Sequence, residues 1–392
     1  MELKEILDIL MFASACGFLM AGFPVAFTLA GTGFIFAVIG WTFGVFDFSL
    51  FGALPSRIFG NAMTNEVLIA VPLFVFMGVM LERSKVAEEL LDSMGMLFGT
   101  LRGGLGVSVT LVGALLAAST GIVGATVVTM GLLSLPTMLR RGYDPSLACG
   151  SICAAGTLGQ IIPPSIVLVL LGDQISNAYI DAQRTLGNWS PEPVSVGDLF
   201  AGSLLPGLAL VGMYMLYQLF MAWFRPNSSP AIPAKELEAS GLGKRIAKAL
   251  IPPIILIVAV LGSILAGIAT PTEAAAVGAV GAVLLAGMRV DRRSNTPIYI
   301  AAISLIVMLF AANTMDLRIS RNEISARDML GIAICVIGAF GLSWGVLVSL
   351  SRTYQAKIEK TGISVLHEVM RSTMEISSMV FIILIGASVF SL

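Results

Sequence analysis

Two clusters of glycine, hydroxyl and amide side chains interrupt long apolar stretches of the sequence. The first interrupts the apolar stretch 105–135 and comprises Ser119, Thr120, Gly121 and Thr126. The second interrupts the next apolar stretch and comprises Gly156, Thr157, Gln160, Pro163 and Pro164. Proline lacks an N–H group and disfavours helix in the residue before it. We therefore expect the chain to leave the helical conformation at both clusters.

A broken helix at membrane depth exposes carbonyl and amide groups that lipid cannot satisfy. Such breaks persist only where protein or a water-filled cavity pairs those groups. In transporters they hold the substrate and the coupling ion near the midplane, because half-helix N-termini attract anions while unwound carbonyls and hydroxyls suit a hard cation such as Na⁺. The alternative is that both clusters are proline kinks and small-residue packing positions. Two breaks in successive segments favour an ion or substrate site.

A third element, residues 267–276, places the carboxylate of Glu273 between two apolar stretches. Thr272 and Glu273 fit the first turn of a helix, where Glu273 would be an ordinary N-terminal residue. The same carboxylate could instead lie near a transport path, since ionisable residues at membrane depth are commonly functional. Both interpretations stay open.

Two common motifs of enzymes are absent. The sequence contains no G-x-x-x-x-G-K-[ST] or H-E-x-x-H pattern, which removes the P-loop and zinc-protease signatures. Residues 341–345 match G-x-S-x-G, but they lie within the expected apolar helix 329–350 and not at the strand-to-helix turn that a serine hydrolase requires. We interpret the single histidine, His367, as an interfacial side chain. The four cysteines lie in apolar stretches and are interpreted as small buried side chains rather than a disulfide framework or a metal site. We expect no enzymatic activity, no cofactor and no metal other than Na⁺ at the two breaks.

The composition predicts an all-α polytopic membrane protein. Of the 392 residues, 57% are hydrophobic and 12% are charged, and the mean hydropathy is +0.93. Soluble proteins carry about 25% charged residues, so this chain has too few polar side chains to cover a water-facing surface. The balance of 23 basic against 24 acidic residues offers no phosphate-neutralising surface, and nucleic acid is not an expected partner.

Apolar segments recur along the chain at lengths near the roughly 20 residues that cross a bilayer. We expect helices near 8–22, 24–45, 66–82, 104–119, 121–139, 146–171, 199–224, 249–268, 274–288, 298–313, 329–350 and 366–390. Residues 84–98 have helical periodicity with one polar face, which fits either an interfacial helix or a loop helix packed on its own protein.

The charges between these segments predict an orientation. The loop 225–248, the pair Arg140–Arg141 and residues 289–293 are basic, whereas the loop 173–198 is acidic. By the positive-inside rule the basic segments are cytoplasmic and the loop 173–198 faces outward.

Several of these motifs carry a family resemblance. Residues 115–132, 135–144 and 156–165 together resemble the large permease subunit of TRAP transporters, the DctM type. Residues 22–27, 71–74 and 269–276 are similar to further motifs of that family, in the expected order. The resemblance covers essentially the whole chain, and the apolar insert near 298–350 is similar to the version labelled mannitol/chloroaromatic-type.

The resemblance implies a secondary transporter of the bacterial inner membrane, built from inverted repeats with broken-helix hairpins. It implies Na⁺-coupled import of an organic acid anion, a C4-dicarboxylate or related carboxylate, by elevator-type movement of a transport domain. The implied partners are a small four-helix membrane subunit and a periplasmic substrate-binding protein. Carried over by motif, Ser119, Thr120, Gly121 and Thr126 belong to the ion or substrate site of the first hairpin. Gly156, Thr157, Gln160, Pro163 and Pro164 form its second break.

The resemblance also suggests a division of the chain. Residues 1–100 would hold scaffold helices and the interfacial helix, and 101–175 the first transport-domain hairpin region. Residues 176–248 would hold an outer loop, a connecting helix and a cytoplasmic linker, and 249–392 the start of a second repeat with the insert. No second copy of the 119–165 pattern follows, so the second repeat is incomplete. The sequence therefore fits either a fragment of such a permease or a truncated, non-transporting membrane scaffold.

Overall fold

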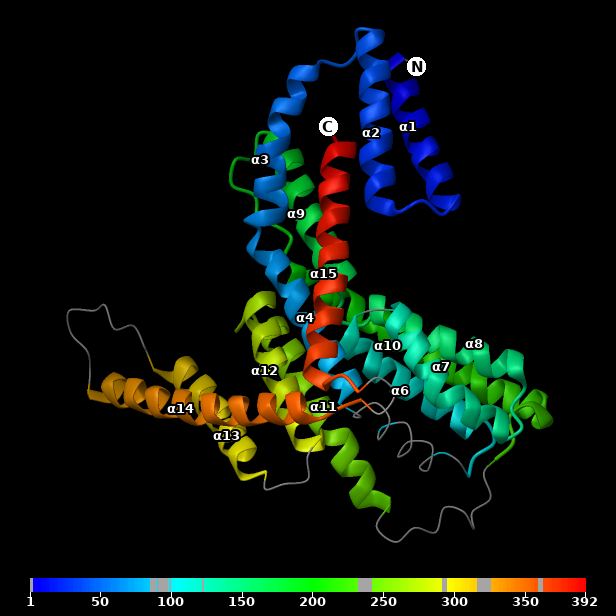
Figure 1. The fold of residues 1–392 in the computed structure, drawn as a ribbon, viewed down its shortest axis with the longest axis vertical. Coiled ribbons are helices and arrows are strands. Elements are labelled where there is room, and N and C mark those ends of the chain that lie inside the picture. Colours follow the sequence, from blue (N-terminus) through cyan, green and yellow to red (C-terminus); the bar gives the residue numbers. More distant parts are fainter. Residues whose placement is uncertain are drawn as a thin grey trace. The chain divides into compact units, whose positions relative to one another are not determined.

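The structure is a computed structural model that describes residues 3–84, 90, 98, 100–121, 123–231, 242–290, 295–315, 326–358 and 362–392. Within these ranges it contains fourteen α-helices and no β-strand (Figure 1). Six of the described helices are long and apolar enough to span a membrane. The predicted all-α polytopic architecture is confirmed. The chain divides into two compact units, Met1–Pro72 with Ser372–Leu392, and Leu73–Arg371.

The first unit contains a helical hairpin packed against the end of the chain. Its helices are α1 (Leu3–Met20), α2 (Val25–Thr42), α3 (Leu54–Ile58) and the last part of α15 (Val365–Phe390). Glycines allow α2 and α15 to pack with their backbones in contact: a Cβ added to Gly386 would lie 2.5 Å from the carbonyl oxygen of Ala26. Arg57 donates a hydrogen bond to the carbonyl of Ser391 at 3.2 Å.

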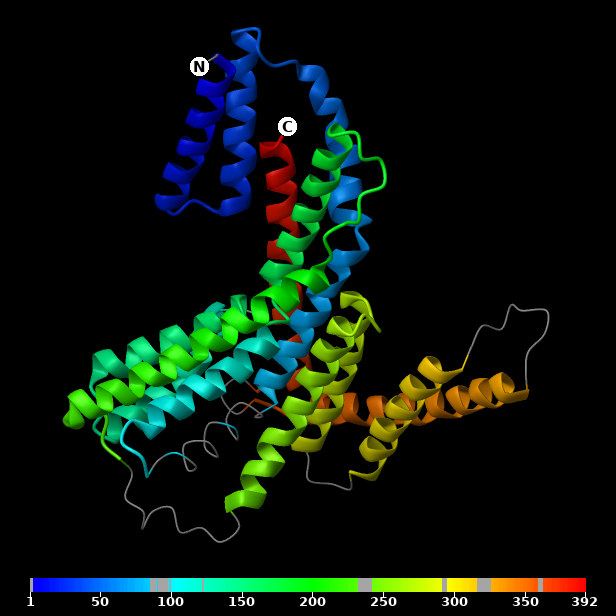
Figure 2. The same ribbon diagram turned by 180° about the vertical axis from the view of Figure 1, so that it is seen from behind.

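Four helices of the second unit lie side by side in Figure 2. They are α6 (Gly104–Thr120), α7 (Val123–Arg140), α8 (Pro145–Thr157) and α10 (Val196–Phe224). Helix α9 (Ile166–Thr185) runs in a different direction and packs on the start of α10, where Gly172 meets Val196. Small residues bring these helices close together, as is usual where no hydrophobic force distinguishes protein from lipid. A Cβ on Gly113 of α6 would lie 2.6 Å from the Cβ of Ala155 in α8.

The remaining helices of the second unit include the predicted insert. They are α4 (Ala70–Arg83), α11 (Leu242–Leu265), α12 (Pro271–Val290), α13 (Thr296–Thr314) and α14 (Ala326–Gln355). The insert forms an antiparallel pair, α13 and α14, with Gly345 of α14 against Ala301 of α13. It is also joined to α12, because Gly287 packs on Ser349 and Arg352 donates a hydrogen bond to the Gly287 carbonyl at 3.4 Å.

A short segment after α10 joins the starts of α6 and α8. The carbonyl of Ser229 accepts a hydrogen bond from the N–H of Gly103 at 3.1 Å, and the carbonyl of Ser228 accepts one from the N–H of Asp144 at 2.9 Å. We call residues 226–230 the strap. Helix starts leave N–H groups without intrahelical partners, and the strap satisfies one at the base of each helix.

Two sequence predictions need correction. The acidic segment 173–198 is not wholly a loop, because α9 continues to Thr185 and Arg184 pairs with Asp181 one turn earlier. Cys16, Cys149 and Cys153 are exposed rather than buried. An apolar pattern does not separate a lipid-facing position from a buried one, since lipid and protein interior are equally apolar. The predicted helix 84–98 lies almost entirely outside the described residues.

Candidate functional site

The first predicted break lies between α6 and α7. Helix α6 ends at Thr120, and α7 begins at Val123. Between them Gly121 has φ +60°, in the left-handed region that side chains with a Cβ disfavour. Glycine at this position therefore allows the chain to leave one helix and enter the next within two residues.

The second predicted break lies between α8 and α9. Helix α8 ends at Thr157 and is followed by a 3₁₀ turn, Leu158–Gln160. The chain then passes through the cis-bonded pair Pro163–Pro164 to Ser165. Ser165 organises the end of this break, because its hydroxyl donates to the carbonyl of Gln160 at 2.8 Å and accepts from the N–H of Leu168 at 3.4 Å. Its side chain thus caps α9 and closes the unwound segment.

The two breaks lie against each other. The side-chain amide Nε2 of Gln160 donates a hydrogen bond to the main-chain carbonyl of Gly121 at 3.4 Å. A Cβ added to Gly121 would lie 3.4 Å from the carbonyl oxygen of Pro164. The flanking helices α7 and α8 approach more closely still, since a Cβ on Gly156 would lie 2.3 Å from Cγ2 of Val127. Four half-helix ends therefore meet at one place.

This arrangement offers both kinds of electrostatic surface. The C-terminal ends of α6 and α8 present carbonyls with partial negative charge, and the N-terminal ends of α7 and α9 present N–H groups with partial positive charge. The Oε1 of Gln160 is buried and has no hydrogen-bond partner among the described residues. Leaving a buried acceptor unpaired costs about 1–3 kcal/mol. A cation or a donor group held between the breaks would satisfy it.

The predicted residues occupy different positions around this junction. Thr126 is buried in the second turn of α7, with 2% exposed, and Gly156, Pro163 and Pro164 are buried. Thr157 is exposed, and its hydroxyl donates back to the carbonyl of Ala154 at 2.7 Å. The backbones of Ser119 and Thr120 form the last turn of α6, but their side chains lie outside the described part of the structure.

Glu273 lies at a helix start, which is one of the two positions that the sequence analysis considered for it. Its Oε2 accepts hydrogen bonds from the N–H of Thr270 at 2.8 Å and from the Thr270 hydroxyl at 3.0 Å. The Thr270 hydroxyl in turn accepts from the N–H of Glu273 at 3.3 Å. This reciprocal pair is a capping box at the start of α12. The carboxylate is thus part of the helix start.

One polar contact between helices was not predicted from the sequence. The hydroxyl of Thr129, on α7, donates a hydrogen bond to the carboxylate of Glu82, at the end of α4. The two residues are 47 positions apart, and nothing in the spacing of either predicts the other. This bond ties the second arm of the α6–α7 hairpin to α4.

The turn at the base of the hairpin carries a buried tyrosine. The N–H of Gly106, in the first turn of α6, donates to the hydroxyl of Tyr143 at 3.3 Å. Burial raises the pKa of Tyr143 above its usual range, against the opposing effect of its bonds to Gly106 and Leu105. The phenol thus stays protonated while it accepts from the start of α6.

Paired helix breaks inside a polytopic helical protein are typical of secondary transporters with discontinuous helices. The family model described as "Tripartite ATP-independent periplasmic transporter, DctM component" matches residues 12–311, which include both breaks and the start of α12. The chain belongs to this family. The resemblance of the sequence motifs is therefore confirmed.

Individual relatives agree with this assignment. The C4-dicarboxylate TRAP transporter large permease protein DctM of Pseudomonas aeruginosa is 33% identical over 256 residues, 64% of this chain and 55% of the relative. Its namesake from Vibrio cholerae is 30% identical over 307 residues, 76% of this chain and 61% of the relative. The ectoine TRAP transporter large permease protein TeaC of Halomonas elongata is 27% identical over 360 residues, 91% of this chain and 72% of the relative.

These relatives are named as transporter permeases, not enzymes. Together with the apolar helices, they identify the chain as a multi-pass protein of the bacterial inner membrane. The chain spans 55–61% of the length of the two C4-dicarboxylate permeases.

Proposed function

We propose that the chain is the large membrane subunit of a binding-protein-dependent secondary transporter that imports an organic acid anion, a C4-dicarboxylate or related carboxylate. The observation that carries the proposal is the contact between the two helix breaks, where the Gln160 amide meets the Gly121 carbonyl. The breaks lie within the region matched by the family model. The names of the relatives from Pseudomonas aeruginosa and Vibrio cholerae supply the substrate class.

The proposed coupling ion is Na⁺, bound at the breaks 119–126 and 156–164. Two features support this choice. The C-terminal ends of α6 and α8 direct carbonyl oxygens toward the junction, which suits a hard cation. The buried Oε1 of Gln160 is an additional oxygen without a partner. The N-terminal ends of α7 and α9 provide the complementary surface for a substrate carboxylate.

The proposed partners follow from the tripartite description of the family. A small membrane subunit would pack beside this chain in the bilayer, and a periplasmic binding protein would deliver the anion. Most of the substrate selection would then lie in the binding protein.

The test is uptake by proteoliposomes that contain this chain, its small subunit and its binding protein. Radiolabelled succinate is supplied with an inward Na⁺ gradient, and then with K⁺ in place of Na⁺. We expect Na⁺-dependent uptake, and we expect Gln160→Leu to lower its initial rate about tenfold, the effect of losing one strong polar contact. The matched control is Gln174→Leu, which changes an exposed glutamine of α9.

The site, the coupling ion and transport itself are each tested by a different result. Unchanged uptake by Gln160→Leu would refute the site. Equal uptake in K⁺ would refute Na⁺ coupling. No uptake with both partners present would favour the non-transporting scaffold over the transporter.

A further inference from the structure

A cavity between α6, α8 and α10 is separate from the two helix breaks. Its volume is about 640 Å³, and its walls come mainly from α8 and α10, with Thr110 of α6 behind them. Ligand sites for small molecules have volumes of about 300–1,000 Å³, so this cavity is large enough for a substantial ligand.

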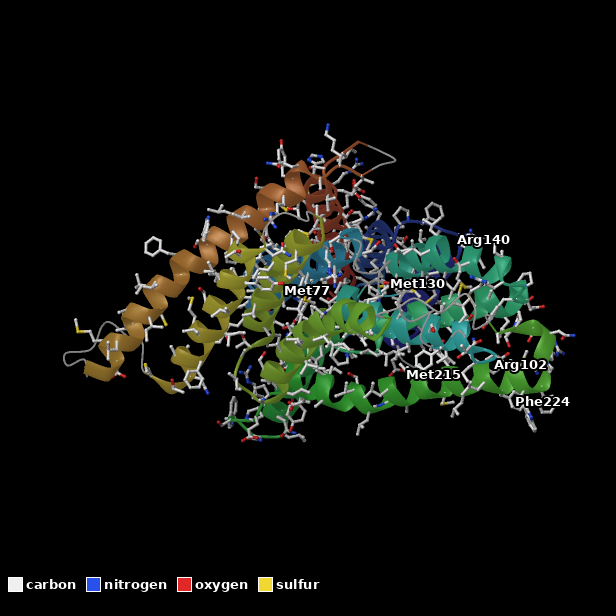
Figure 3. The ribbon with its side chains drawn as sticks, turned by 90° about the horizontal axis from the view of Figure 1, so that it is seen from below. Met77, Arg102, Met130, Arg140, Met215 and Phe224 are labelled. Carbon is white, nitrogen blue, oxygen red and sulfur yellow. The ribbon has the colours of Figure 1, made fainter. Side chains whose placement is uncertain are left out.

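One end of the cavity is polar and carries one charge of each sign. Asp144, Ser146, Arg225 and Ser228 line this end. Arg225 immediately follows the apolar span of α10, which ends at Phe224. Figure 3 shows Phe224 at the same end of the four side-by-side helices as Arg102 and Arg140. Aromatic and basic residues gather where a helix leaves the bilayer, so the polar end lies at the membrane–water interface on the predicted cytoplasmic side.

The rest of the cavity is mainly apolar and opens sideways. Leu147, Gly150 and Ala154 form one wall, and Met213, Tyr217 and Met221 form the other. Met213 is 63% exposed and Tyr217 is 54% exposed, so the outer wall faces the surroundings of the helix bundle. An α-helix is about 10 Å wide and rises about 5.4 Å per turn, so less than about two turns would fill the cavity. The volume therefore suits a flexible chain better than a partner helix.

We propose that this cavity binds a phospholipid with a phosphate and a primary ammonium in its headgroup, that is, a lipid of the phosphatidylethanolamine class. An acyl chain lies between α8 and α10, the phosphate pairs with Arg225, and the ammonium pairs with the carboxylate of Asp144. Because the polar end carries one positive and one negative group, a zwitterionic headgroup complements it better than an anionic one. A primary ammonium also supplies N–H donors, which a quaternary choline headgroup lacks.

The wall of the cavity contains a further unsatisfied polar group. Gln218 is 2% exposed, lines the cavity, and has an Oε1 without a hydrogen-bond partner among the described residues. Its Oε1 is turned toward α6, because a Cβ added to Gly106 would lie 2.5 Å from it. Gln218 therefore closes the back of the cavity, and Asp144 and Arg225 are the charged groups that can meet an occupant.

The experiment measures lipid retention by the purified full chain with native mass spectrometry, as the protein is titrated with phosphatidylethanolamine, phosphatidylcholine or phosphatidylglycerol of the same acyl chains. We expect phosphatidylethanolamine to bind about fivefold more tightly than either of the others, the effect of about one interfacial charge contact. The Oδ1 of Asp144 caps α8 by accepting from the N–H groups of Ser146 at 2.9 Å and Leu147 at 3.1 Å. Asp144→Asn keeps this cap, because Asn caps helices as well as Asp, and it should abolish the preference over phosphatidylcholine. Arg225→Gln should weaken the binding of all three lipids, because each of them carries a phosphate.

A cavity-filling variant tests the position of the acyl chain. A Cβ on Gly150 meets no atom within 4 Å, so Gly150→Phe places a ring in the cavity without a backbone clash. We expect it to weaken phosphatidylethanolamine binding about fivefold or more. The matched controls are Gly202→Phe, at an equally open position of α10 outside the lining, and Arg140→Gln, a basic residue of the same interface outside the lining.

Unchanged retention by Gly150→Phe, or equal binding of the three lipids by the unmodified chain, would overturn the proposal. Loss of binding in Gly202→Phe equal to that in Gly150→Phe would overturn it as well, because retention would then not depend on this cavity.

Discussion

The amide nitrogen of Gln160 lies 3.4 Å from the carbonyl oxygen of Gly121 and donates a hydrogen bond to it. The two residues belong to different helix breaks, 39 positions apart. This side-chain contact joins the two unwound segments and gives the Gly121 carbonyl a partner that lipid could not supply. It makes each break dependent on the other for its geometry.

The conformation of Gly121 should make it intolerant of a side chain. Gly121→Ala adds a Cβ at φ +60°, and we expect a loss of about 1–2 kcal/mol in stability. The matched control is Gly124→Ala, three residues later in α7, where a Cβ meets no atom within 4 Å. Alanine is the better helix former, so this control should be neutral or stabilising. Thermal unfolding of the purified variants in detergent measures both, and equal midpoints would contradict the prediction.

The contact between α7 and α8 should be sensitive to one methyl group. Gly156→Ala would place its Cβ 2.3 Å from Cγ2 of Val127, and we expect overpacking to cost about 1–3 kcal/mol. Val127→Ala removes that methyl group, so the double variant should recover part of the loss. Additive effects in a double-mutant cycle of unfolding free energies would show that the two positions do not contact each other.

The bond between Thr129 and Glu82 should contribute to the docking of the hairpin on α4. Thr129→Val keeps the shape of the side chain but removes the donor to the Glu82 carboxylate. We expect a loss of about 1–3 kcal/mol, because a charged acceptor loses its partner. Thr129→Ser retains a hydroxyl and should lose much less. Thermal unfolding of the three proteins distinguishes these outcomes, and equal losses for Val and Ser would assign the effect to packing instead.

The capping role of Glu273 predicts a stability effect without a transport effect. Glu273→Ala removes the acceptor for Thr270 and should destabilise α12 by about 0.5–1.5 kcal/mol, the net contribution of a typical hydrogen bond. Glu273→Gln keeps an oxygen at the same position, as a capping box allows, and should be nearly neutral. Uptake per folded protein should be unchanged in both. Normal stability with lost uptake in Glu273→Gln would place the carboxylate on the transport path.

The positions of the breaks could be predicted because they depend on local chemistry. Gly121 adopts a conformation that few other residues tolerate, and the Pro163–Pro164 pair lacks two backbone donors. Both effects act within a few residues, so the local sequence is enough to predict where the helices break. The capping box of Thr270 and Glu273 is predictable for the same reason, since both partners lie within one turn.

The contacts between elements could not be predicted in the same way. The bonds from Gln160 to Gly121 and from Thr129 to Glu82 depend on how helices pack, and helix packing is set by side-chain volumes along whole faces. The outward position of Cys149 and Cys153 has a similar origin. A helix surrounded by lipid is apolar on every face, so its periodicity carries no information about which face is buried.

The strap protects two backbone amides that are far apart in the sequence. The N–H groups of Gly103 and Asp144 both donate to adjacent carbonyls, those of Ser229 and Ser228. Because both acceptors lie on the same short segment, lifting that segment exposes both donors in a single opening event. Hydrogen exchange at the two amides should therefore proceed at matched rates and respond together to temperature, so that either amide reports whether the bases of α6 and α8 are closed.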